Sequence, residues 1–181
     1  MKCEHCDIIE RRSKIEILYE DEEVVVAIKD LSITPGQITV FPKEHFTILE
    51  GVPENILEKC SLIANKIGIA VFESLGSQGT NIMIQNGLGA GQKVPHFAIE
   101  VVPRVENDGL NLTWEAKQLP EDEMETAFMT LEQGMKELDS SVENEDDGKE
   151  GSNKTKDKSD KKIAKEDDKD NYLLKSLKKI P

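Results

Sequence analysis

Residues 91–104 read GQKVPHFAIEVVPR and contain His96, the last histidine of the chain. The residues from His96 onward are mostly apolar or β-branched, and Pro103 closes the run, so we predict a strand over residues 96–102. Before it, residues 86–92 contain three glycines and predict a loop whose backbone can approach a ligand. His96 would therefore stand at a strand end, where a sheet holds a side chain rigidly.

The sequence on either side of this stretch predicts an α+β fold. Strand-length apolar runs joined by short turns favour antiparallel pairing, and apolar residues spaced three and four apart predict helices. A Pro at the start of the longer helix and a Gly after it are typical helix boundaries. The predicted strands cover residues 15–19, 24–28, 37–41 and 81–85, and the predicted helices cover residues 53–75 and 121–138.

The composition changes abruptly after residue 139. Residues 140–170 contain eleven acidic and eight basic residues and almost no apolar side chains. Such a segment buries too little apolar surface to offset its chain entropy, so we predict a disordered charged linker. Apolar periodicity returns over residues 171–181, which predicts a C-terminal docking segment. The expected organisation is thus one domain over residues 1–139, then the linker and the docking segment.

Charge and cysteine usage narrow the class of protein. The formal net charge is -13, and a chain this acidic should repel nucleic acid and anionic membrane surfaces. No apolar run approaches the ~20 residues that span a bilayer, and the N-terminus MKCEHCDIIERR lacks a signal-peptide pattern. We therefore expect a cytoplasmic protein with neither nucleic acid nor membrane as partner. Its three cysteines should then be reduced thiols rather than a disulfide framework.

Cys3 and Cys6 form a CxxC pair, a spacing at which two thiolates can bind one tetrahedral metal ion. The chain has only three histidines, and His45 and His96 are the candidates for the remaining two ligands. His5 lies between the cysteines, so its ring would have difficulty turning back onto the same ion. The pattern predicts a zinc site. A redox pair, two free thiols or ordinary surface and core histidines would also fit the spacing.

The stretch at 91–104 resembles the signature of the histidine triad (HIT) family, GQ-x-V-x-H-x-H-x-H followed by apolar residues and Pro-Arg. Other motifs occur in the family's order across residues 1 to about 138. They are Cys3-x-x-Cys6 with Asp7-Ile8-Ile9, Tyr19-Glu20-Asp21-Glu22 before a strand that ends at Asp30, Pro42-Lys43-Glu44-His45, and Asn86-Gly87. The resemblance implies a HIT-like fold, an antiparallel sheet with one long helix and a second C-terminal helix, and an N-terminus held by zinc.

The resemblance also implies roles for individual residues. Zinc-bearing members use the CxxC, the histidine of the Pro-Lys-x-His step and the first triad histidine. These correspond to Cys3, Cys6, His45 and His96, and four protein ligands with no open position describe a structural ion. Three residues match the family's nucleotide-binding positions. Asp30 corresponds to the residue that binds the ribose hydroxyls, and Asn86 and Gln92 correspond to residues that face the phosphates.

The triad itself departs from the family pattern. The middle histidine, which is the family's nucleophile, is replaced by Ala98, and the third is replaced by Glu100. A methyl group cannot form a covalent phosphoramidate, and covalent catalysis requires an activated nucleophile. The sequence therefore predicts the degenerate triad His96-x-Ala98-x-Glu100 and no catalytic residue.

Three functions follow as hypotheses. The first is a zinc-containing protein that binds a purine nucleoside or nucleotide and lacks covalent histidine catalysis. The second is a hydrolase of nucleotide phosphoramidates or dinucleoside polyphosphates, or a nucleotidyl transferase, in which Glu100 acts as a general base. The third is a protein-interaction module that uses the C-terminal segment. The resemblance further implies a homodimer.

Overall fold

The computed structural model describes residues 3–111 and 115–146. These residues separate into two compact units, one ending at Gly109 and the other beginning at Leu110. The first unit contains the sheet and every candidate site residue. In the second, the helix α3 spans Glu121–Asp146.

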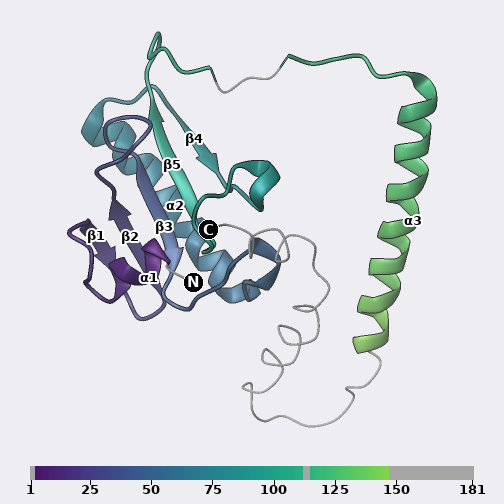
Figure 1. Ribbon diagram of the computed structural model, residues 1–181, viewed down its shortest axis with the longest axis horizontal. Helices are drawn as coiled ribbons and strands as arrows, with labels where there is room; N and C mark the ends of the chain where they lie inside the picture. The colour runs from purple at the N-terminus through teal and green to yellow at the C-terminus, as the bar shows by residue number, and fades with distance from the viewer. Residues whose placement is uncertain (1–2, 112–114, 147–181) are drawn as a thin grey trace. The chain divides into compact units, whose positions relative to one another are not determined.

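The first unit is built on a five-stranded antiparallel sheet in the order β1-β2-β3-β5-β4. Neighbouring strands lie side by side in this order in Figure 1. β4 and β1 are the edge strands. The strands are β1 (Glu16–Glu20), β2 (Val24–Ile28), β3 (Ile38–Pro42), β4 (Gly79–Met83) and β5 (Ile99–Arg104).

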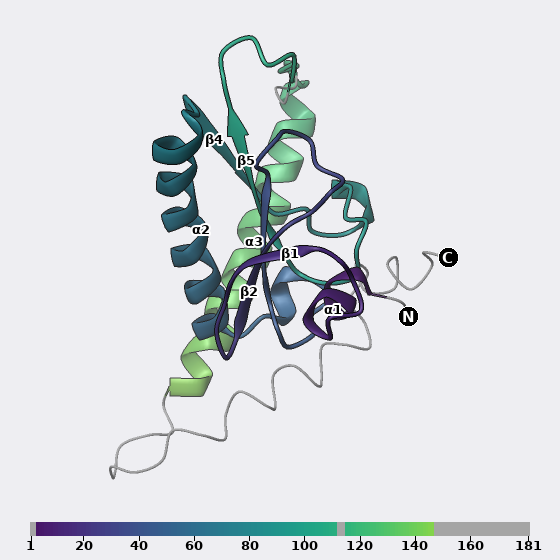
Figure 2. The same cartoon turned by 90° about the vertical axis from the view of Figure 1, so that its left-hand side faces the viewer.

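Each face of the sheet is covered by a different helix (Figure 2). The long helix α2 (Glu54–Leu75) packs on one face, against alternate strand residues such as Val26, Val40 and Val101. The short helix α1 (Glu4–Ile9) covers part of the other face, where Ile8 joins a cluster of buried side chains. β2 and β3 are buried along nearly their whole length because both of their faces are covered. This explains why β2 reads as a continuous apolar run rather than an alternating one.

The sequence predicts the α+β class, the antiparallel sheet and the long helix, and the structure confirms them. β2 has the predicted bounds, β1 and β3 lie one residue later than predicted, and the other two strands are displaced further. The strand predicted over residues 81–85 is β4 at Gly79–Met83, and the strand predicted from residue 96 begins only at Ile99. β5 also includes Pro103, which pairs with Thr80 of β4. The proline lies beyond the ladder with β3, because that pairing ends at Val101.

Local geometry at the helices differs from the expectation in two places. The sequence pattern does not predict a helix at the CxxC, yet α1 forms there and is six residues long. α3 continues to Asp146, beyond the predicted end at Leu138. In the part of the chain that the structure describes, no helix is both long enough and apolar enough to cross a membrane. The remainder of the predicted linker and the segment 171–181 lie outside the described residues, so this division stays a prediction.

Candidate metal centre

Cys3 and Cys6 stand at the first turn of α1. Cys3 is the N-cap residue and is buried, and its carbonyl accepts a hydrogen bond of 3.0 Å from the Asp7 backbone N–H. Cys6 lies three residues further along the helix and is half-buried. Residues at this spacing occupy one face of a helix, so both sulfur atoms point to the same side. The short helix therefore converts the CxxC spacing into a pair of converging ligands.

The two histidines reach this pair from the region around the end of β3 and the turn before β5. His45 follows β3 and is exposed, whereas His96 is buried and precedes β5 by three residues. The Nε2 atom of His96 lies 2.9 Å from the Pro42 carbonyl oxygen. Because a carbonyl can only accept, Nε2 carries the hydrogen and donates it. The Nδ1 atom is thereby left with a free lone pair, an orientation typical of metal-binding histidines.

Both imidazoles present Nδ1 to the sulfurs. Nδ1 of His96 lies 3.4 Å from the Cys3 sulfur and 3.7 Å from the Cys6 sulfur, and Nδ1 of His45 lies 3.2 Å from the Cys6 sulfur. All four ligand atoms lie within 4.8 Å of one another. Zinc bonds of about 2.3 Å to sulfur and about 2.0 Å to nitrogen put tetrahedral ligand atoms roughly 3.3–3.8 Å apart. The quartet predicted from the sequence is thus brought together, with three of its ligand-atom pairs at or close to the spacing of a tetrahedral zinc site.

Burial favours the neutral forms of the quartet side chains while no ion is bound. Burial, together with the neighbouring Cys3 thiol, raises the pKa of Cys6 to about 11. Burial also lowers the pKa of His96 to about 4, so its ring is neutral and able to coordinate at neutral pH. A divalent ion would supply the positive charge that the two thiols need in order to lose their protons. The donor set therefore fits Zn²⁺.

His5 turns away from the quartet, as its position between the cysteines predicts. Its ring is buried and stacks on Phe41, with 4.3 Å between the ring centroids. Its Nε2 accepts a hydrogen bond of 2.9 Å from Lys29 Nζ. Burial and the nearby Lys29 charge hold the pKa of His5 well below its usual value. His5 thus joins α1 to the sheet through a neutral ring, a role that the sequence pattern does not reveal.

Ala98 and Glu100 lie on the sheet face that α1 covers. Ala98 packs against the cluster formed by Ile8, Val25, Ala27 and Phe41. Glu100 is paired in register with Thr39 of β3, and its Oε2 accepts hydrogen bonds of 2.8 Å from the Thr39 hydroxyl and from the Gln37 amide. Glu100 Oε1 lies 3.9 Å from Lys29 Nζ. Sequence reasoning missed Lys29, because only the pairing of β2, β3 and β5 brings it near Glu100.

The predicted nucleotide-binding residues lie on two separate loops. Asp30 is exposed after the end of β2. Asn86 and Gln92 belong to the glycine-rich loop, and both use their amides to hold that loop in place. Asn86 accepts from the Leu49 N–H at 3.0 Å and donates to the Glu50 carboxylate. Gln92 is buried, and its side-chain amide makes three hydrogen bonds to backbone groups of Gly87, Thr47 and Val94. The nucleotide-binding role of these residues stays a prediction.

Comparison with known families agrees with this architecture. The family described as the HIT domain matches residues 10–107, which is more than half of the chain. The chain belongs to the HIT family. The matched residues include His45 and His96 and all five strands of the sheet. The CxxC pair lies just before the matched region.

Three similar proteins place this HIT domain among its relatives. An uncharacterized HIT-like protein from Methanocaldococcus jannaschii is 34% identical over 108 residues, covering 59% of this chain and 82% of that protein. The adenylylsulfatase HINT3 from Arabidopsis thaliana is 31% identical over 121 residues, covering 65% of this chain but only 58% of that protein. A Zn-bound histidine triad family protein from Mycobacterium smegmatis is 30% identical with a TM-score of 0.58, covering 65% of this chain and 85% of that one.

Proposed function

We propose that this HIT-family chain binds a purine nucleoside or nucleotide and has lost covalent histidine catalysis. The observation that carries the proposal is the methyl group of Ala98, at the position that matches the family's nucleophile, beside a complete Cys2His2 quartet. The quartet keeps the fold's metal site, while the neighbouring position has no group that could attack a phosphate. We therefore assign no catalytic residue to the triad positions His96, Ala98 and Glu100.

The proposed metal is a structural Zn²⁺ held by Cys3, Cys6, His45 and His96. All four positions of a tetrahedral ion are then taken by protein atoms, which leaves none for a substrate or a water molecule. The Zn-bound relative from Mycobacterium smegmatis supports the choice of metal. Because the ligands come from α1, from the segment after β3 and from the turn before β5, the ion would tie the N-terminus to two strands. Part of the binding free energy would thus stabilise the fold.

The surroundings of Glu100 argue against the hydrolase or transferase alternative. A general base needs a free lone pair directed at the proton that it removes. Glu100 Oε2 instead accepts two hydrogen bonds from Gln37 and Thr39, and Oε1 faces the ammonium group of Lys29. The carboxylate is therefore fixed within the sheet face rather than poised to accept a proton.

The choice of ligand class rests on the family and on one relative. The Arabidopsis protein is named an adenylylsulfatase, which makes adenine compounds the first probes for this chain. We propose that Asp30 accepts hydrogen bonds from ribose hydroxyls, since an exposed carboxylate is a double acceptor. Asn86 and Gln92 would act by shaping the loop beside the ligand.

The test uses the full-length, zinc-loaded protein. Adenosine and adenosine monophosphate are titrated by calorimetry, and adenosine phosphoramidate and a dinucleoside polyphosphate are offered as substrates. We expect at least one of the two titrants to bind, without turnover of either substrate above the rate in buffer. Hydrolysis that Glu100→Gln abolishes would show that Glu100 is catalytic and would overturn the proposal. Failure of both titrants to bind would remove the nucleotide-binding part.

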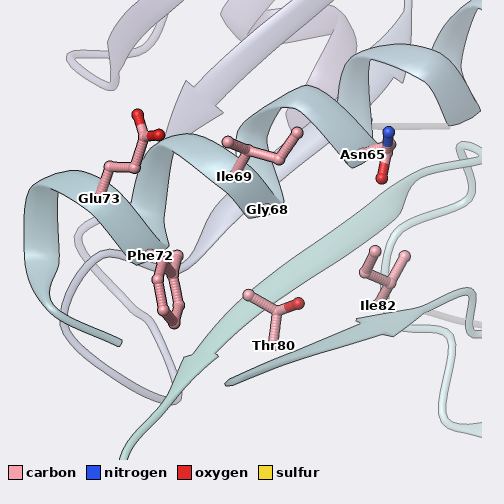
Figure 3. Close-up of a pocket in the computed structure, with 7 residues that line it drawn as sticks. All are labelled: Asn65, Gly68, Ile69, Phe72, Glu73, Thr80 and Ile82. Carbon is pink, nitrogen blue, oxygen red and sulfur yellow. The ribbon is translucent and has the colours of Figure 1, made fainter. Parts of the chain in front are cut away.

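We also propose a homodimer formed through α2 and the edge strand β4. Large apolar side chains are exposed on both elements, and a groove of about 310 Å³ lies between them (Figure 3). Ile69 and Phe72 of α2 and Ile82 of β4 line it and are 54%, 60% and 52% exposed. An edge strand with free backbone groups beside an apolar helix face suits pairing with a second copy.

The proposal also covers the cellular compartment, the excluded partners and the C-terminal segment. A cytoplasmic location is proposed because the thiol pair Cys3 and Cys6 would need a reducing compartment to remain available for zinc. The acidic net charge supports the absence of nucleic acid and membrane partners. Docking of residues 171–181 on the body of the protein or on a partner also stays a proposal.

A further inference from the structure

Lys29 and Glu100 form an ion pair on the sheet face that carries Ala98. The two side chains are 15% and 17% exposed, so water screens their charges only partly. Glu100 cannot move freely, because Gln37 and Thr39 both donate to its Oε2 at 2.8 Å. A fixed negative charge therefore stands two residues along the chain from Ala98, on the same side of the strand.

The positive charge of Lys29 is already shared among groups of the protein. Its Nζ donates to His5 Nε2 at 2.9 Å and lies 3.9 Å from Glu100 Oε1 and 4.0 Å from Glu4 Oε2. The formal charges of Glu4, Lys29 and Glu100 sum to (-1) + (+1) + (-1) = -1. An arriving phosphate would have to compete with two carboxylates and an imidazole for this one ammonium group. Lys29 is thus a counter-ion for the protein's own carboxylates rather than a clamp for an anion.

We propose that the Lys29–Glu100 pair makes this site selective for uncharged nucleosides over their phosphate esters. The inference rests on the proposed function, because it assumes that the ligand lies beside Ala98. Glu100 stands at the position that matches the third triad histidine, so a phosphate bound beside Ala98 would meet its negative charge, whereas a nucleoside brings no charge to that end. A phosphate placed beside the partly screened Glu100 carboxylate would be repelled by it. A preference of at least about ten-fold in Kd is therefore expected.

Substitutions of Glu100 and of Lys29 should change the preference for the nucleoside in opposite directions. Glu100→Gln keeps the shape and an oxygen that can accept from Gln37 and Thr39, but removes the negative charge. Lys29→Met keeps the length of the apolar stem but leaves Glu100 without its counter-ion. The measured quantity is the ratio of the Kd of adenosine monophosphate to the Kd of adenosine, on zinc-loaded full-length protein. Adenosine serves as the internal reference, because a general loss of structure would weaken both compounds together.

In the unmodified protein, adenosine should bind at least about ten-fold more tightly than adenosine monophosphate. Glu100→Gln should lower the ratio by about ten-fold, and Lys29→Met should raise it. The matched control is Glu58→Gln, which makes the same chemical change at an exposed position of α2, on the opposite face of the sheet, and should leave the ratio unchanged.

Two results would overturn the inference while leaving the proposed function intact. In the first result, adenosine monophosphate binds the unmodified protein at least as tightly as adenosine does, and Lys29→Met weakens the binding of the monophosphate alone. That result would make Lys29 a phosphate clamp. The other is a ratio that Glu100→Gln does not change. Absence of binding by both compounds would instead contradict the proposed function and the inference together.

Discussion

His96 shows how one side chain acquires its role from two contacts. Donation from Nε2 to the Pro42 carbonyl fixes the ring, and Nδ1 is then directed between the two sulfurs. The same ring contacts His45 edge-on, with 4.9 Å between the centroids. His96 is therefore oriented before any ion arrives, which reduces the entropy that metal binding must overcome.

Removal of one ligand should release the metal and lower stability together. Cys3→Ser and His45→Ala each leave three ligands, so we expect the zinc content to fall from about one per chain to well below that value. The midpoint of thermal unfolding should fall in both variants, because metal binding is coupled to folding. Elemental analysis and calorimetry provide the two measurements.

Cys60→Ser is the matched control for the cysteine variant. Cys60 is buried in α2, on the opposite face of the sheet from the quartet. This variant should lose some stability, because it places a hydroxyl among apolar neighbours, but it should keep its zinc. Full zinc content in both ligand variants would contradict the assigned quartet.

Gln92 is a second residue whose contribution to the stability of the fold can be measured by a single substitution. Its Oε1 accepts from the Gly87 N–H at 2.7 Å, and its Nε2 donates to the Thr47 and Val94 carbonyls at 2.7 and 3.0 Å. Gln92→Ala leaves these buried partners unsatisfied, so the free energy of unfolding should fall by about 1–3 kcal/mol. Urea denaturation measures the change. Gln85→Ala, an exposed position at the other end of the same loop, should change it by less than about 0.5 kcal/mol.

At the scale of elements, the turn between β1 and β2 is held by one carboxylate. Asp21 Oδ1 accepts from the backbone N–H groups of Glu23 and Val24 at 2.8 and 2.9 Å. Its Oδ2 accepts from the Tyr19 hydroxyl at 3.0 Å and lies 3.1 Å from Lys59 Nζ on α2. The turn is thereby tied both to its own strands and to the long helix.

Asp21 should make the domain sensitive to acid. Burial raises the pKa of this carboxyl, but the hydrogen bonds from Glu23, Val24, Lys59 and Tyr19 outweigh burial and hold it well below its usual value. A lowered folded-state pKa means that the stabilisation is fully present above the unfolded value of about 3.9 and is lost as the pH falls through the folded value.

The corresponding variant is Asp21→Asn. It should lower the free energy of unfolding by about 1–2 kcal/mol at neutral pH and flatten its decline below about pH 4. Urea denaturation across pH measures both effects, with Glu22→Gln at the neighbouring exposed position as the control. An acid profile identical to that of the unmodified protein would show that Asp21 does not carry this stabilisation.

At the scale of the whole molecule, the apolar surface of α2 and β4 predicts association. Phe72→Glu places a charge in the centre of the exposed patch, where a second copy would bury it without a partner. Sedimentation should show a dimer for the unmodified chain and a monomer for the variant. Leu18→Glu, an exposed apolar position on the opposite edge strand β1, should remain dimeric. An unmodified chain that sediments as a monomer would contradict the proposed dimer.

The C-terminal part of the chain allows a separate test at this scale. Deletion of residues 140–181 removes the predicted linker and docking segment. If that segment docks on the body of the protein, the midpoint of thermal unfolding should fall, and if it bridges two copies the dimer should also weaken. Calorimetry and sedimentation of the shortened chain distinguish these cases. Unchanged values in both measurements would show that the segment docks on neither.

The sequence by itself determined the class of fold and pointed to the four residues of the Cys2His2 quartet. Hydrophobic periodicity is local, so the buried run at 24–28 and the long helix could be read directly, and the scarcity of cysteine and histidine left few candidate ligands. The boundaries of β4 and β5 could not be read, because pairing across the sheet sets them. The tertiary structure alone placed Lys29 beside Glu100 and turned His5 onto Phe41. Those contacts join residues 71 and 36 positions apart, and only the packing of α1 and three strands brings such distant side chains within reach.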